Sequence, residues 1–256
     1  MSKGQQCTIS GKCYEIVVFN TINTLMYNNY QFTSQLEKNL GGSTNGIDLI
    51  CNYNNKPNIG IEIKKKNTPD WMQCSIKYYE DKKKWCGSEH SKIPVASREI
   101  FNNLLKNSIL FNNKIPPFVK NRIKHSEWLD IKKNTTDFKD IYIDIPNTTI
   151  RDIYKEKGCY YIQVSNRGLY HLGNDIYKFG VPEFIVDQQI RIRTKIHKIC
   201  NKQGYCNMSV MAACQPRNIN LLVASKYSLD TYARLPKGLL PRVLTSLYSI
   251  NKYRWF

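Results

Sequence analysis

Two short apolar segments that carry acidic residues constrain the fold of this chain most. Residues 46–51 (Gly-Ile-Asp-Leu-Ile-Cys) and residues 59–64 (Ile-Gly-Ile-Glu-Ile-Lys) are joined by Asn-Tyr-Asn-Asn-Lys-Pro-Asn. Apolar runs of this length, separated by Asn and Pro, predict two β-strands that form a hairpin. Because side chains alternate between the two faces of a strand, Glu62 and Lys64 are expected on one face and the isoleucines between them on the other.

Pairing of the two strands would bring Asp48, Glu62 and Lys64 together. An acidic pair in a largely apolar hairpin is costly to bury without a partner. Mg²⁺ is a suitable partner, since it prefers oxygen ligands and often binds one or two carboxylates together with a substrate phosphate. Lys64 would then hold the attacking water and stabilise charge that develops on phosphorus. The alternative for a Glu-x-Lys strand is a solvated surface pair of little energetic value; the apolar neighbours of Asp48 and Glu62 argue against it.

Asp48 followed fourteen residues later by Glu62-Ile63-Lys64 resembles the PD-(D/E)XK nuclease superfamily, which includes many restriction endonucleases and junction resolvases. The resemblance implies that Asp48, Glu62 and the backbone carbonyl of Ile63 bind Mg²⁺, with Mn²⁺ as an alternative metal. It also implies that Lys64 positions the nucleophilic water. The proline that the family places before the aspartate is absent here.

Two predicted helices beside the hairpin extend the resemblance. A helix is expected over residues 11–29 with Ser10 as its N-cap, and Glu15 within it matches a further acid of the family. A second helix is expected from Pro69 to Tyr79, and Gln73 within it matches a polar residue that the family often has near the site. The ordinary alternative for Glu15 is a solvent-exposed glutamate on the helix surface. The ordinary alternative for Gln73 is a helix cap or a hydrogen bond in the core.

The rest of the chain predicts a further helix and several strands. The expected elements are a helix over 97–110, a hairpin of strands 160–164 and 168–172, and extended segments 181–186, 189–199 and 220–225. The predicted fold class is α/β, with a restriction-endonuclease-like mixed β-sheet flanked by helices. A single compact domain over residues 1–256 is expected, with a catalytic core at about 10–110 and a basic, β-rich elaboration at about 140–256.

The charge of the chain predicts a polyanionic partner. Lys and Arg number 38 against 20 Asp and Glu, which gives a formal net charge of +18. Such an excess attracts nucleic acid, because each neutralised phosphate releases a counterion. The alternative explanation is codon bias, since an A+T-rich genome also raises the lysine content. In residues 189–198 the odd positions are mostly basic and the even ones mostly apolar, as in a strand with one cationic face. The predicted DNA contacts are Lys65, Lys66, Arg167, Arg191, Arg193, Lys195 and Lys198.

The nine cysteines include no Cys-x-x-Cys pair, so most are expected to be reduced, buried thiols. A zinc site of His197, Cys200, Cys206 and Cys214 could be drawn, but its spacing matches no common zinc motif. No apolar run approaches the roughly 18 residues of a membrane-spanning helix, and the first residues lack the apolar core of a secretory signal. An intracellular protein without a membrane partner is therefore predicted.

These patterns together predict a Mg²⁺-dependent endonuclease that hydrolyses phosphodiester bonds of double-stranded DNA. The basic strands favour a sequence-specific enzyme of the type II restriction kind. A homodimer is expected because a duplex cut requires two active sites, and a restriction role would demand a cognate methyltransferase. The alternatives are a structure-specific nuclease of the resolvase or repair type and a non-catalytic nucleic-acid-binding protein.

Overall fold

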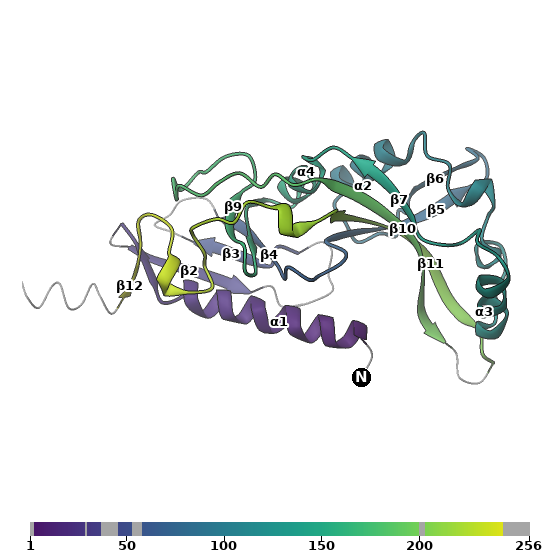
Figure 1. Ribbon diagram of the computed structural model, residues 1–256, viewed down its shortest axis with the longest axis horizontal. Coiled ribbons are helices and arrows are strands. Elements are labelled where there is room, and N and C mark those ends of the chain that lie inside the picture. Colours follow the sequence, from purple (N-terminus) through teal and green to yellow (C-terminus); the bar gives the residue numbers. More distant parts are fainter. Residues whose placement is uncertain (1–2, 29, 37–45, 53–57, 200–202, 243–256) are drawn as a thin grey trace, which may run out of the picture. The chain divides into compact units, whose positions relative to one another are not determined.

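The computed structural model describes residues 3–28, 30–36, 46–52, 58–199 and 203–242 (Figure 1). The chain forms two compact units. The first unit comprises residues 1–68, 154–186 and 218–256, and the second unit comprises residues 69–153 and 187–217. The chain therefore leaves the first unit twice and returns to it twice.

This division differs from the expected single domain with a core at residues 10–110. That stretch is shared between the units, because the chain enters a separate sheet after Thr68. The basic stretch at 140–256 is likewise divided between the units. Each unit has its own sheet, so position along the chain does not separate the expected catalytic core from the expected elaboration.

The first unit is built on a seven-stranded mixed sheet in the order β12-β1-β2-β3-β4-β8-β9. Its strands are β1 (Leu25–Tyr27), β2 (Tyr30–Leu36), β3 (Leu49–Asn52), β4 (Ile59–Lys64), β8 (Cys159–Val164), β9 (Gly168–His171) and β12 (Leu239–Pro241). All neighbours are antiparallel except β4 and β8, which are parallel. A parallel pair needs a long crossover, and here the crossover contains most of the second unit. The predicted hairpins β3–β4 and β8–β9 are confirmed, as is the α/β class.

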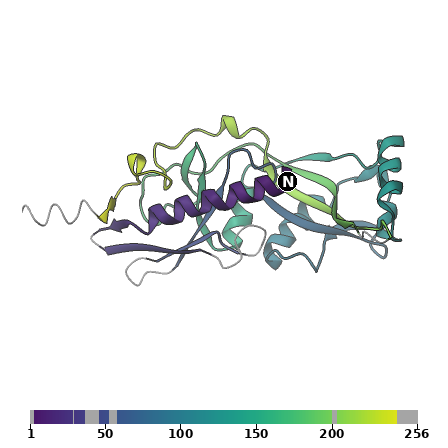
Figure 2. The same cartoon turned by 90° about the horizontal axis from the view of Figure 1, so that it is seen from below.

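Helix α1 (Lys3–Ile22) packs against β2 and β4 (Figures 1 and 2). Its Val18 and Ile22 are fully buried in one apolar cluster with the isoleucines of β4. The helix begins before the predicted start, so Ser10 lies inside it and is not its N-cap. It also ends earlier than residue 29, because residues 25–27 are taken into the sheet as β1.

Helix α4 (Thr149–Glu156) leads the chain back into the first unit and directly into β8. The turn between them contains Gly158 with a positive φ of 85°, a backbone conformation that favours glycine. The carbonyl of Gly158 accepts a hydrogen bond from the amide of Gly60 at 3.2 Å. A Cβ at Gly60 would lie 2.5 Å from that carbonyl oxygen, so only glycine allows β4 to approach this turn.

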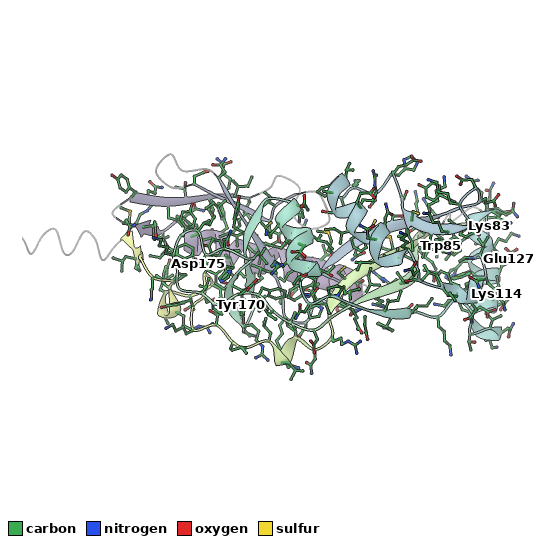
Figure 3. The ribbon with its side chains drawn as sticks, turned by 90° about the horizontal axis from the view of Figure 1, so that it is seen from above. Lys83, Trp85, Lys114, Glu127, Tyr170 and Asp175 are labelled. Carbon is green, nitrogen blue, oxygen red and sulfur yellow. The ribbon has the colours of Figure 1, made fainter. Side chains whose placement is uncertain are left out.

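The second unit contains an antiparallel five-stranded sheet in the order β6-β5-β11-β10-β7. Its strands are β5 (Met72–Tyr79), β6 (Lys84–Gly87), β7 (Ile141–Ile145), β10 (Gln188–Ile199) and β11 (Cys206–Pro216). The helices of this unit are α2 (Val95–Leu105) and α3 (His125–Asn134), with short 3₁₀ turns at Phe111–Asn113 (η1) and Pro117–Val119 (η2). Aromatic rings pack in its core: Trp85, labelled in Figure 3, meets Phe111 edge-on at 5.9 Å between ring centroids.

Three predictions of local structure are wrong. The expected helix from Pro69 to Tyr79 is strand β5, in which Met72, Cys74 and Ile76 are buried and the residues between them are not. That period of two is the pattern of a strand. Residues 181–186 form only an isolated bridge, through Glu183. Residues 220–225 form no strand; their first two residues belong to the 3₁₀ turn η3 (Ile219–Leu221). A second 3₁₀ turn of the first unit is η4 (Tyr232–Arg234). None of the helices in the described ranges has both the length and the hydropathy of a membrane span.

Candidate active site

The β3–β4 hairpin brings together the three residues on which the sequence analysis depends. Leu49 pairs with Ile61 across the hairpin, so Asp48, one residue earlier, lies opposite Glu62. The Lys64 ammonium lies 2.5 Å from Glu62 Oε1 and 3.4 Å from Asp48 Oδ2. The amide of Ile63 donates a hydrogen bond to the same Asp48 oxygen at 2.8 Å. The predicted convergence of two carboxylates and one ammonium is therefore present.

Glu62 has a second cationic partner, which the sequence analysis missed. The ammonium of Lys157, the residue directly after α4, lies 2.9 Å from Glu62 Oε2. Both side chains are almost inaccessible, with 3% of Lys157 and 2% of Glu62 exposed. The Cys159 thiol also donates to Glu62 Oε2, at 3.7 Å. Each Glu62 oxygen thus accepts from one ammonium.

An aromatic ring supports both ammonium groups. Tyr154, from α4, is fully buried. The Lys64 and Lys157 nitrogens lie 5.6 and 5.3 Å from its ring centroid, within the range of cation–π attraction. Tyr154 from α4 and Lys157 directly after it therefore lie beside Glu62 and Lys64.

The charges of Glu62 and Lys64 stabilise each other. Burial opposes the ionisation of Glu62, but the neighbouring ammonium groups of Lys64 and Lys157 outweigh burial and lower the pKa of its carboxyl. Burial likewise opposes the charge of Lys64, yet Asp48 and Glu62 raise its pKa well above the ordinary value. Lys64 is consequently an ammonium at neutral pH. It can donate hydrogen bonds and offset negative charge, but it cannot accept a proton from water.

Glu15 completes a group of three acidic side chains. It lies on the buried face of α1, with 9% of its surface exposed. Burial and the nearby charge of Asp48 raise the pKa of Glu15 to about 7. Burial and Glu62 raise the pKa of Asp48 as well. The charges of Asp48 and Glu62 therefore act on Glu15, although no hydrogen bond or ion pair joins Glu15 to either of them among the described residues.

The residues present suit a hard divalent cation in their chemistry. Asp48 and Glu62 both direct an oxygen toward one cationic atom, the Lys64 nitrogen. Mg²⁺ characteristically uses only one or two carboxylates, with water and substrate oxygens as its other ligands. Among the described residues, no group of three or more His, Cys, Asp or Glu side chains has the arrangement of a metal centre made by protein alone. A bound cation would have to share Glu62 with the two lysines.

Gln73 does not belong to this cluster. It lies on β5 in the second unit, where it pairs with Ala213, whereas the other predicted catalytic and metal-binding residues lie in the first unit. The helix that contributes Tyr154 beside the site is α4, within which the chain returns to the first unit. Ile63 lies between Glu62 and Lys64 with its side chain buried in the apolar core.

Two of the predicted DNA contacts already have carboxylate partners. Arg193 lies 2.8 Å from Asp70, and Arg191 lies 2.5 Å from Asp140 and 3.6 Å from Asp70. Asp70 is buried, with 4% of its side chain exposed. The alternation along β10 is confirmed in its first half, where residues 190 and 192 are fully buried. Its arginines, however, balance acidic groups of their own unit.

The other predicted contacts differ in how far they are bound. Lys65 donates to Ser10 on α1, and the amide of Lys66 donates to Ser165 at 2.9 Å. Arg167 donates to the Leu222 carbonyl at 3.4 Å, and its own carbonyl accepts from Tyr170, labelled in Figure 3. These contacts hold loops of the first unit. Lys195 and Lys198 lie on β10, and Lys198 is exposed at its end.

The zinc arrangement considered from the sequence cannot form in the described part of the chain. Cys206 and Cys214 lie near opposite ends of β11, about 26 Å apart at roughly 3.3 Å per residue. His197 shares a hydrogen bond of 2.7 Å with Ser209. Cys200 lies outside the described residues.

A sequence signal for Lys157 existed. Lys155-Glu156-Lys157-Gly158 ends α4, and glycine after a lysine-containing turn is a common helix stop. That signal predicts the helix, but it does not predict that the helix packs beside Glu62. Only the parallel pairing of β4 with β8 establishes that proximity.

Comparisons with known proteins add no assignment. Models of protein families, curated proteins and solved structures were each compared with the chain, and none of them matches. The function has to be argued from the chemistry of this site.

Proposed function

We propose that the protein is a Mg²⁺-dependent endonuclease with a PD-(D/E)XK-like site, acting on double-stranded DNA. The observation that carries the proposal is the convergence of Asp48 and Glu62 on the Lys64 ammonium, which lies within hydrogen-bond distance of both carboxylates. The order of the contributing elements, a helix with Glu15 followed by the hairpin, supports it, and so does the net charge of +18.

Each residue has a defined role in this proposal. Asp48 and Glu62, with Glu15 beside them, would hold the cation, which when bound offsets negative charge on the phosphate and its leaving oxygen. Lys64 is held as an ammonium by the two carboxylates, so it orients the attacking water by donating a hydrogen bond and stabilises developing negative charge. Lys157 holds one oxygen of Glu62 and thereby fixes the direction of the other.

The finer parts of the proposal concern substrate and assembly. A sequence-specific enzyme of the restriction type, working as a homodimer with a cognate methyltransferase, is the form we favour. A structure-specific nuclease is the enzymatic alternative. Discrete fragments from unmethylated duplex DNA would support the first, and preference for branched or damaged DNA would support the second.

A non-catalytic nucleic-acid-binding protein is the second candidate function. The observation that favours it is that two lysines already neutralise Glu62, so the buried charges are balanced without a metal ion. In that case the buried charges of Glu62, Lys64 and Lys157 would stabilise the fold of the first unit and would have no catalytic role.

Cleavage of supercoiled plasmid in Mg²⁺ or Mn²⁺, with a chelator as the blank, distinguishes the two candidates. Asp48→Asn and Lys64→Met are expected to lower the cleavage rate by roughly 100-fold or more, the usual effect of removing one charge-stabilising group. Lys155→Met, which changes an exposed lysine of α4, is the matched control and should cleave normally. Duplex binding without cleavage in any divalent metal would instead establish the non-catalytic protein.

A further inference from the structure

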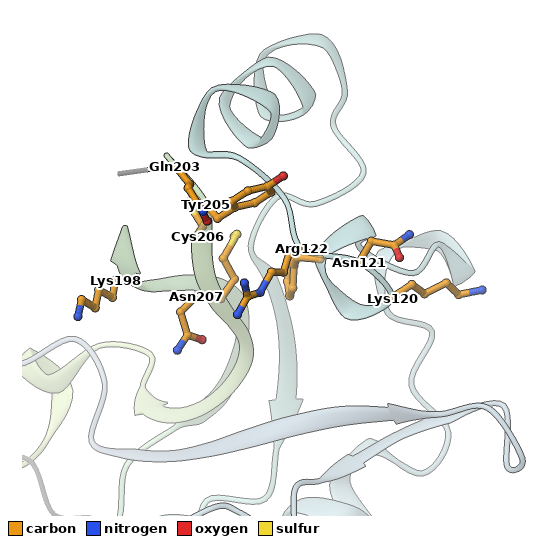
Figure 4. Close-up of a pocket in the computed structure, with 10 residues that line it drawn as sticks. Lys120, Asn121, Arg122, Lys198, Gln203, Tyr205, Cys206 and Asn207 are labelled. Atoms are coloured by element: carbon orange, nitrogen blue, oxygen red, sulfur yellow. The ribbon is translucent and has the colours of Figure 1, made fainter. Parts of the chain in front are cut away.

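The second unit contains a cationic cavity at the end of the β10–β11 hairpin. The cavity has a volume of about 570 Å³, within the roughly 300–1,000 Å³ typical of small-molecule sites. Its walls come from the segment after η2 and from the facing ends of β10 and β11 (Figure 4). It is separate from the candidate active site, all of whose residues belong to the first unit.

Irregular strand pairing brings the polar residues of the cavity together. The β10–β11 register shifts between Ile196 and Lys198, which places Lys198 directly opposite Asn207. Such a bulge changes the direction of the side chains that follow it. The amide of Cys206 donates to the Ile123 carbonyl at 2.9 Å, and this bond fixes the neighbouring Arg122 beside the hairpin. In Figure 4 the Arg122 side chain extends toward the strand that carries Asn207.

Two of the three cationic side chains that line the cavity have no acidic partner among the described residues. Arg122 and Lys198 both line it, and none of the described lining residues is acidic. Within the described ranges no ion pair involves Arg122 or Lys198, in contrast to the arginines of β10. Lys120, the third cationic residue of the lining, lies 3.7 Å from the exposed carboxylate of Glu80. The cavity therefore favours an anion, and two cationic groups suit a phosphate.

The remaining lining favours an aromatic group on that anion. Tyr205 lines the cavity beside Arg122, and a tyrosine ring offers a face on which a nucleic-acid base can stack. Gln203 and Asn207 contribute side-chain amides, which carry both donors and acceptors and can pair with the edge of a base. A simple inorganic anion would leave the ring and the amides unused.

We propose that this cavity binds one nucleoside phosphate. The base stacks on Tyr205, the amides of Gln203 and Asn207 contact its edge, and Arg122 and Lys198 hold the phosphate. This chemistry is shared by a free nucleotide and by one unstacked nucleotide of a single strand. It does not depend on cleavage at the first unit, because no residue of that site takes part.

Binding of a short fluorescein-labelled single strand to the full chain, measured by fluorescence anisotropy in a chelator, tests the proposal. Tyr205→Leu is expected to weaken binding by about 5- to 100-fold, the usual range for loss of one stacked base, and Tyr205→Phe should retain affinity. Arg122→Gln combined with Lys198→Gln should weaken binding and reduce the salt dependence by about one to two phosphate contacts. Lys132→Gln with Lys133→Gln, both exposed on α3, is the control of equal charge.

Competition with unlabelled compounds identifies the source of the ligand. A mononucleotide that displaces the probe supports a site for free nucleotides, whereas displacement by oligonucleotides alone supports a single-strand site. Inorganic phosphate that competes as strongly as the mononucleotide overturns the proposal, and so does unchanged binding by Tyr205→Leu. Should Tyr205→Leu fail to fold, the double variants test the proposal: equal single-strand affinity of the Arg122/Lys198 variant and the Lys132/Lys133 control would overturn it.

The same measurement on Asp48→Asn separates this proposal from the proposed function. Lost cleavage with intact single-strand binding leaves the cavity assignment standing. Normal cleavage by the Arg122 and Lys198 variant, with unaltered single-strand affinity, overturns the cavity assignment and leaves the nuclease proposal untouched.

Discussion

Replacing Lys157 by methionine tests the electrostatic account of the candidate site. The substitution removes the ammonium that lies 2.9 Å from Glu62 Oε2 and retains a side chain of similar length. Breaking a buried ion pair by removing one partner costs about 3–5 kcal/mol when the other charge is left alone. Here Glu62 keeps Lys64 on its second oxygen at 2.5 Å, so the loss should be smaller. Only Oε2 loses its charged donor, and one buried hydrogen bond to a charged group contributes about 1.5–3 kcal/mol.

We therefore expect Lys157→Met to lower the free energy of unfolding by about 2–3 kcal/mol, or the melting temperature by roughly 4–12 °C. Lys155→Met, two residues away and exposed, should change stability by no more than about 0.5 kcal/mol. A double-mutant cycle with Glu62→Gln should give a coupling energy of at least about 1 kcal/mol. Equal stability of the Lys157 and Lys155 variants, or strict additivity in the cycle, would refute this account of the buried charges.

Two further predictions concern buried acids. The pKa of Glu15 is raised from about 4.5 to about 7, so its folded-state stabilisation is present below 4.5 and lost as pH rises through 7. Glu15→Gln should therefore be more stable than the wild type by about 1–3 kcal/mol at pH 8 but not at pH 4.5; a difference independent of pH contradicts this. Asp70→Asn should destabilise the protein by about 1–3 kcal/mol through loss of the Arg193 pair, measured by thermal denaturation against the exposed Asp130→Asn. If Asp70→Asn left the stability unchanged and made DNA binding tighter, Arg191 and Arg193 would be DNA contacts instead of partners that stabilise the fold.

The sequence sufficed for those parts of the fold that local pattern determines. The β3–β4 hairpin could be predicted because two apolar runs flank a turn-rich linker, and the positions of Asp48, Glu62 and Lys64 followed from the alternation of side chains. Glu15 was assigned only through the resemblance to the nuclease superfamily, and the structure adds that it shares the buried face of α1 with Val18 and Ile22.

The errors arose where a local pattern fits two structures. Residues 72–79 contain apolar side chains at 72, 74 and 76, a strand pattern, but Trp71 and Tyr79 extend the set and also match helical spacing. Gln73 was placed near the site only because that segment was expected to be a helix. The division into two units was equally hidden, because it depends on which strands pair across long separations and not on composition.

Lys157 shows why the site itself exceeds the sequence motif. The motif contains one lysine, yet the fold supplies a second from a segment ninety-five residues beyond Glu62. Its ammonium binds Oε2, so Oε1 is the oxygen that faces Lys64, and the same Lys64 ammonium also contacts Asp48. If Glu62 binds a cation, Lys157 is thus the group that directs the carboxylate, and its loss should impair cleavage as well as stability. If the cluster is only structural, the protein has no cleavage activity to impair and only its stability should fall. Impaired cleavage by a Lys157→Met protein that remains folded would therefore support the catalytic role of Glu62.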